Sequence, residues 1–132
     1  MLAGFATPEQ AAALVRHVFD EATFASPWGV CTLAKDERMF DLSVTNNPSN
    51  WLGPIWLVAN YAVFRGLMNY GYRAEAEKIA EGSLRLLTDD LKESGSIHEY
   101  YSPLDGKPVM NGGFINWNIL ALTMQRELEK AP

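Results

Sequence analysis

The chain has 132 residues, 48% of them hydrophobic and 20% charged, and it carries a formal net charge of −5. This length predicts one domain over residues 1–132, and the composition excludes intrinsic disorder. An acidic chain repels phosphate groups, so neither nucleic acids nor anionic membranes are expected as partners.

The cysteine content and the N-terminal segment bear on the compartment. The single Cys31 cannot form an intrachain disulfide, so the fold does not need oxidising conditions. We expect Cys31 to be a small packed side chain rather than a nucleophile. The first ten residues lack the basic and apolar regions of a signal peptide, and a cytoplasmic protein is expected.

The first predicted helix starts at Pro8. Thr7 can cap it, proline suits the first helical position, and Gln10 completes a capping box. Apolar residues then recur at helical spacing to about residue 24, where the approach to Pro27 disfavours continuation.

A long connection follows over residues 26–53. It is rich in Pro, Gly and Asn and is predicted to be irregular, with a short strand around 40–44. Connections of this length inside compact domains are commonly functional.

Two helices are predicted next, joined by a tight turn at Gly71. The first opens at Pro54 and is apolar all round over 55–64 except for Asn60. It is too short for a membrane span and is expected to be buried on all sides, so Asn60 would need a partner or a polar cavity. The second, over 73–91, has one apolar and one charged face, which predicts an outer helix.

The last part contains an unusual acidic stretch and a fourth helix. Residues 95–108 read GSIHEYYSPLDGKP and place Glu99 between His98 and two tyrosines in a predicted loop. The fourth helix is predicted over 114–130. Four helices and two long loops indicate an all-α chain.

Common catalytic signatures are absent from the sequence. We find no nucleophile elbow, P-loop, dinucleotide fingerprint or zinc-ligand spacing, so no cofactor and no metal are expected. His17 and His98 lack a metal-site spacing, and His98 is expected to form hydrogen bonds in its loop rather than act as a catalyst.

The remaining polar and aromatic residues suit carbohydrate. Sugar rings have apolar C–H faces that pack on aromatic rings, and their hydroxyls need hydrogen-bond partners. For Trp56 a purely structural core position is the favoured alternative, and for Trp51 the two interpretations are even. The residues of this kind are Trp51, Trp56, Asn60, Glu99, Tyr100, Tyr101, Asn116, Trp117 and Asn118.

Four stretches of the sequence together carry a resemblance to a known family. They are PWGVCTLAKDERMF, NWLGPIWLVANYAVFRGLMNYGY, HEYYSPLDGKP and FINWNILAL. The second resembles the Trp-x-Gly-Pro-(Ile/Val)-Trp segment of the (α/α)6-barrel glycoside hydrolases, and the others resemble the loop before it, the loop after the helical hairpin and the next helix. The order agrees over about residues 5 to 122. The part resembled is the C-terminal part of the barrel in the family 63 group and its glucosidase and trehalase-like relatives.

The resemblance implies a fold and a site. It implies part of an (α/α)6 toroid, about four of its twelve helices, with a small carbohydrate as ligand. Glu99 falls on the family's general base in an inverting mechanism, and the segment around Trp51 on a substrate-lining position. Leu52, Asn116 and Asn118 depart from the residues usual there. The predicted substrate-binding residues are Trp51, Gly53, Pro54, Trp56, Asn60, Tyr100, Tyr101 and Trp117.

The resemblance also implies an incomplete site, because the family's general acid lies in an earlier part of the barrel. We expect the 132 residues to be catalytically incomplete alone. Three situations fit: a fragment of a longer enzyme, a free-standing sugar-binding product, or a homo-oligomer in which three copies rebuild a ring. The alternative class is a helical-hairpin scaffold for protein interactions.

Overall fold

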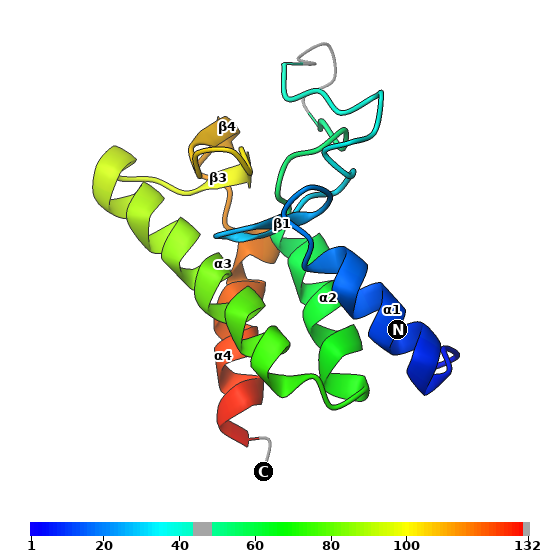
Figure 1. Ribbon diagram of the computed structural model, residues 1–132. Helices are drawn as coiled ribbons and strands as arrows, with labels where there is room; N and C mark the ends of the chain where they lie inside the picture. Colours follow the sequence, from blue (N-terminus) through cyan, green and yellow to red (C-terminus); the bar gives the residue numbers. More distant parts are fainter. Residues whose placement is uncertain (44–48, 131–132) are drawn as a thin grey trace.

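The computed structural model describes residues 1–43 and 49–130 (Figure 1). Within these ranges the chain forms four α-helices and two two-stranded antiparallel sheets, and about half of it is helical, so it is not strictly all-α as predicted. The elements are α1 (Pro8–Val18), β1 (Ala25–Ser26), β2 (Gly29–Val30), α2 (Leu57–Asn69), α3 (Arg73–Ser94), β3 (His98–Tyr101), β4 (Pro108–Gly112), the 3₁₀ turn η1 (Asn116–Ile119) and α4 (Leu120–Lys130).

The predicted start of α1 is confirmed, and its predicted end is wrong. The Thr7 N–H donates to Gln10 Oε1 at 2.8 Å and the Gln10 N–H donates to Thr7 Oγ1 at 3.3 Å, as a capping box requires. The helix ends at Val18 instead of near residue 24. The side chain of Asp20 accepts the Ala22 N–H at 2.9 Å, a local bond that competes with helix continuation.

The described residues of the connection between α1 and α2 are mostly irregular, as predicted, but they include the short β1–β2 hairpin. The strand predicted over 40–44 is not formed at residues 40–43, and Val44 lies outside the described residues. Asp41 instead accepts the Ser43 N–H at 2.7 Å in a local turn. Cys31 is buried, as expected, and burial raises the pKa of its thiol.

Helix α2 starts three residues later than Pro54. Ile55 is extended because its N–H donates to the Tyr101 carbonyl at 2.8 Å and its own carbonyl accepts the Tyr101 N–H at 3.1 Å. Trp56 is therefore the residue before the helix and not part of it. The pairing links the start of α2 directly to β3.

The predicted helical pair is confirmed in outline. Helix α3 covers the predicted 73–91 and continues to Ser94, where Gly95 adopts a left-handed conformation at φ +73° and ends it. Helices α2, α3 and α4 pack together around a core that includes Phe64, Leu67 and Met124.

Helix α2 is not buried on all sides by the described residues. A groove with mostly apolar walls runs between α1, α2 and the N-terminal residues, with Met1, Leu14, Val18 and Val63 in its walls. No helix of the described ranges is long and apolar enough to cross a membrane.

The segment predicted as a loop around Glu99 is instead the antiparallel β3–β4 hairpin. Figure 1 shows this hairpin and the connection before α2 at one end of the helices, with the C-terminus at the other end. The predicted fourth helix starts with the η1 turn and continues as α4. Both segments that hold the predicted sugar site therefore meet at the same end of the fold.

Candidate functional site

Glu99 lies on β3 and is only 6% exposed. The register pairs His98 with Gly112 and Tyr100 with Met110, so Asn111 stands opposite Glu99. The Asn111 Nδ2 group donates a hydrogen bond to Glu99 Oε2. Asn111 has φ +58°, a left-handed conformation that asparagine tolerates better than most side chains. The carboxylate thus has a defined partner and little contact with water.

Three aromatic rings form a stack beside this strand. The ring centroids of Trp51 and Trp56 are 4.0 Å apart with planes at 12°, and those of Trp56 and Tyr100 are 4.8 Å apart at 15°. Trp56 and Tyr100 are buried, whereas Trp51 ends the stack and is 45% exposed. The Trp56 indole N–H donates to the Asn50 carbonyl at 2.8 Å, which fixes the middle ring. Trp51 is therefore the ring of this stack that a solute can reach.

Burial raises the pKa of the Tyr100 hydroxyl. The backbone of Asn50 opposes this rise, and the negative charge of Glu99 adds to it. The phenol therefore stays protonated at neutral pH.

Trp117 lies against the same stack from η1. Its ring centroid is 5.7 Å from that of Trp56 and 4.9 Å from that of Phe114. Its indole N–H is buried and has no hydrogen-bond partner among the described residues. A buried donor without a partner costs stability, which makes a ligand or water oxygen its natural acceptor.

The contacts of Gly53 and Pro54 determine the path of the backbone. Gly53 has φ +135°, and a Cβ there would lie 2.5 Å from the Phe40 ring. The Pro54 carbonyl accepts the Thr32 hydroxyl at 2.8 Å. These contacts position the chain between the first two rings of the stack.

Asn60 finds its partners inside the protein. Its Oδ1 accepts the Val30 N–H at 3.0 Å, and its Nδ2 donates to the Trp28 carbonyl at 3.3 Å and to Ser83 Oγ at 3.0 Å. The expected need for a partner is met, and the amide links β2 to α3. These bonds favour a structural role, and the predicted sugar contact of Asn60 stays a prediction.

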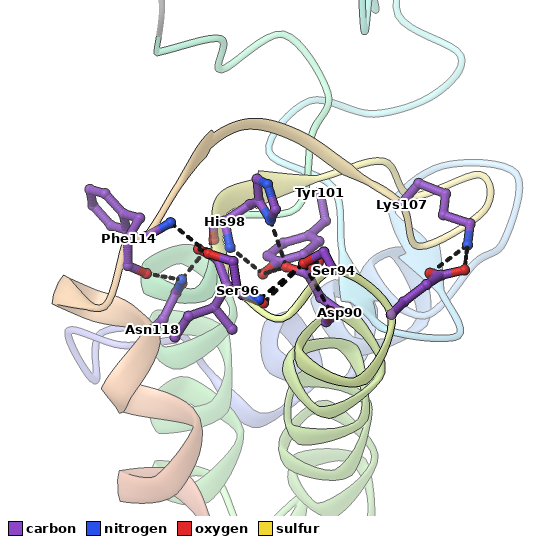
Figure 2. Close-up of polar contacts among 11 residues, drawn as sticks. Asp90, Ser94, Ser96, His98, Tyr101, Lys107, Phe114 and Asn118 are labelled. Atoms are coloured by element: carbon purple, nitrogen blue, oxygen red, sulfur yellow. Dashed lines mark hydrogen bonds and ion pairs between the residues drawn. The ribbon is translucent and has the colours of Figure 1, made fainter.

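Tyr101 and His98 share a buried carboxylate, Asp90 of α3 (Figure 2). Asp90 Oδ2 accepts the Tyr101 hydroxyl at 2.8 Å and lies 2.8 Å from His98 Nδ1. Asp90 Oδ1 accepts the Ser94 hydroxyl at 2.8 Å. The hydrogen bonds expected of His98 are confirmed, although it lies on a strand and not in a loop.

This environment sets the ionisation of the group. Burial raises the pKa of Asp90, but hydrogen bonds from His98, Tyr101 and Ser94 outweigh it and hold that pKa below its usual value. Burial also raises the pKa of Tyr101, so its hydroxyl remains a donor.

Two residues near Glu99, Asp90 and Asn111, were not predicted from the sequence. Asp90 continues the buried row of α3 at helical spacing after Ile79, Ser83 and Leu86, so a carboxylate in an apolar row was the available signal. Asn111 becomes visible only when the hairpin register is known.

A large cavity lies elsewhere. It measures about 520 Å³ and lies between α3 and the β1–β2 hairpin, next to Ser26, Lys78 and Arg85. It does not include Glu99 or any ring of the stack, so size alone does not identify the chemical site. Nowhere in residues 1–43 and 49–130 do three His, Cys, Asp or Glu side chains gather as metal ligands would.

Comparisons with known proteins bear on the same residues. A family model for the mannosylglycerate hydrolase MGH1-like glycoside hydrolase domain matches residues 1–117. The mannosylglycerate hydrolase MGH1 of Selaginella moellendorffii is 39% identical over 67 residues, 51% of this chain and 12% of that protein. The probable mannosyl-oligosaccharide glucosidase of Schizosaccharomyces pombe is 25% identical over 124 residues, 86% of this chain and 15% of that protein.

Solved structures share the fold. The family 63 mannosylglycerate hydrolase of Thermus thermophilus, crystallised with Tris and D-glycerate, matches 96% of this chain with a TM-score of 0.73 and 24% identity. The match covers 28% of that chain. Such neighbours are (α/α)6 barrels, and the chain corresponds to a small part of each.

Proposed function

Because the chain belongs to the mannosylglycerate hydrolase MGH1-like glycoside hydrolase domain family, we propose that it carries the general-base half of a sugar-cleaving site. In this proposal Glu99 is the base, and Trp51 and Trp117 contact the sugar. The substrate is a small glycoside, such as the mannosylglycerate after which one relative is named.

One observation carries the proposal: a buried, oriented carboxylate lies next in sequence to the inner ring of an aromatic stack whose outer ring is half-exposed. Burying a carboxylate costs free energy unless it is hydrogen-bonded, and Asn111 holds Glu99 by one oxygen. Tyr100 follows Glu99 directly and joins the stack that ends at the exposed ring of Trp51. A folding role alone needs neither the acid nor the exposed indole.

The proposed reaction inverts the anomeric carbon. Glu99 takes a proton from a water molecule, and the water oxygen forms a bond to that carbon as its bond to the leaving oxygen breaks. A separate carboxylic acid gives its proton to the leaving oxygen. The two carboxyl groups of inverting enzymes lie roughly 6.5–9.5 Å apart.

We propose that the acid comes from outside these 132 residues. The family resemblance puts it in an earlier part of the barrel, and the match covers 28–29% of the Thermus enzyme chains crystallised with D-glycerate or glucose. The remainder of a barrel would bring it, or a carboxylate from a further copy of this chain would take its place. The apolar groove beside α2 supports such a partner, because it leaves Val18 and Val63 incompletely covered.

Three of the predicted ligands have a supporting role in this proposal. Tyr101 is fully buried and its hydroxyl is bound to Asp90, and both polar atoms of Asn60 are engaged. Trp56 forms the middle layer under Trp51 and does not touch the sugar itself.

The test is sugar binding followed by tryptophan fluorescence. Glucose, trehalose, glucosylglycerate and D-glycerate are titrated into the wild-type chain and into Trp51→Ala. We expect at least one ligand to change the emission, with affinity roughly 2- to 10-fold weaker in the variant, as the loss of one aromatic contact implies. Trp28→Phe, which changes an indole packed against Gly106, is the matched control.

Glu99→Gln separates binding from chemistry. It should bind sugar about as well as the wild type, while in any assembly that hydrolyses substrate the rate falls by about 10²–10⁴-fold. If no sugar alters the fluorescence of either protein, the helical scaffold is the better interpretation. A monomeric mass by sedimentation would exclude a ring of three copies.

A further inference from the structure

Hydrogen bonds from the residues on both sides of Glu99 lead to one carboxylate oxygen. The His98 N–H donates to the Tyr101 hydroxyl at 2.8 Å, and that hydroxyl donates to Asp90 Oδ2 at 2.8 Å. The His98 ring reaches the same oxygen through Nδ1 at 2.8 Å. Residues 98 and 101 thus bracket Glu99 and share one anchor, as Figure 2 shows for the labelled side chains.

The anchor itself is fixed. Asp90 is 3% exposed and lies four residues before the end of the 22-residue α3. Its second oxygen accepts the Ser94 hydroxyl one helical turn later, at 2.8 Å. A buried carboxylate with three donors cannot rotate without leaving a donor unpaired, so its position is set by α3.

Further contacts hold the two ends of β3. The His98 carbonyl accepts Asn118 Nδ2 at 2.7 Å, and the Tyr101 backbone pairs with Ile55 through two hydrogen bonds. The pairing with β4 is irregular between Tyr100 and Tyr101, where the alternation of a strand breaks down. The hydrogen bond from the His98 N–H to the Tyr101 hydroxyl spans this irregularity and holds residues 98 and 101 together.

From these contacts we infer that Asp90, acting through Tyr101 and His98, is a positioning residue for Glu99. It fixes the strand on both sides of the acid, and this directs the Glu99 carboxylate to Asn111. The consequence for sugar chemistry rests on the proposed function, whereas the geometry does not. Misplacing a reacting group by about 1 Å can cost about 10²-fold in rate, so such an anchor would matter for a base.

The test uses the Asn111 side-chain amide as a reporter. In nuclear magnetic resonance spectra of the full chain, the hydrogen bond to Glu99 should set the Asn111 amide protons apart from those of asparagines that donate no such bond. Asp90→Asn and Tyr101→Phe should both lose this distinct shift while the far-ultraviolet circular dichroism of the helices is kept.

Two controls separate positioning from stability. Asp89→Asn makes the same chemical change one residue earlier, on a side chain that is not buried. Ile79→Val loosens the buried face of α3 about three turns from Asp90. Both should keep the Asn111 signal, and Ile79→Val should do so despite a lower melting temperature.

The outcomes are distinct. An unchanged Asn111 signal in folded Tyr101→Phe overturns the inference, and so does its loss in Ile79→Val. If Asp90→Asn does not fold, Tyr101→Phe alone decides. Loss of the signal in the network variants, combined with no sugar binding by the wild type, supports the positioning role and contradicts the proposed function.

Discussion

Replacing Asn60 by alanine should destabilise the fold and leave sugar contacts intact. The change leaves three groups without their partner: the Val30 N–H, the Trp28 carbonyl and Ser83 Oγ, with Val30 and Ser83 buried. At about 0.5–1.5 kcal/mol net for each hydrogen bond, the loss sums to about 3 kcal/mol. That is a large part of the roughly 5–15 kcal/mol that holds a typical domain folded.

Urea denaturation followed by circular dichroism measures this loss. Asn69→Ala is the matched control, because Asn69 lies on the same helix but donates only an exposed bond to the Leu2 carbonyl at 3.1 Å. It should cost less than about 0.5 kcal/mol, as exposed substitutions usually do. A cost below about 1 kcal/mol for Asn60→Ala, together with loss of sugar binding, would refute the structural role and restore Asn60 as a ligand.

Three further predictions concern other parts of the site. The pKa of Asp90 is lowered by folding from 3.8, so its network should stabilise the fold above about pH 4 and lose that contribution as the pH falls through the lower folded value. The free energy of unfolding should therefore fall less steeply with decreasing pH for Asp90→Asn than for the wild type. Gly53→Ala should lower stability by about 1–3 kcal/mol, because φ +135° and a crowded ring oppose a side chain there. Gly71→Ala is the control, because Gly71 has φ +77° but open space around it. This change should lower the free energy of unfolding by about 1 kcal/mol, with both glycine variants measured by thermal unfolding. Trp51→Ala should lower the melting temperature by less than a core variant does, because the ring stacks on Trp56 but is 45% exposed. A fall comparable to that of a core variant would show that the ring is structural.

Local signals predicted the parts of the fold that depend on neighbours in sequence. The capping box at Thr7 and the row of apolar residues in α3 are such signals, and both helices start where expected. Failures came from distant partners. Ile55 reads as helix, yet its backbone pairs with Tyr101, and no pattern near Ile55 reveals this.

The site follows the same division. The resemblance singled out Glu99 and Trp51, but it could not show that Glu99 lies on a strand opposite Asn111. The pairing of Glu99 with Asn111 depends on the register of the hairpin. The strands of this hairpin show little alternation of apolar and polar residues from which the register could be predicted. Asp90 was hidden because a carboxylate on a helix is usually exposed, and only the three-dimensional packing shows it buried.

The pairing of Ile55 with Tyr101 also has a bearing on the order of folding. The two residues lie far apart in the sequence, with the whole α2–α3 pair between them, whereas α2 and α3 are joined by a short turn and can pack early. Contacts that close long loops form late because their entropy cost precedes their gain. We therefore expect a helical intermediate in which the rings of Trp56 and Tyr100 are not yet stacked. Quenching between these rings would then report the last step of folding, separately from the rise of helical signal.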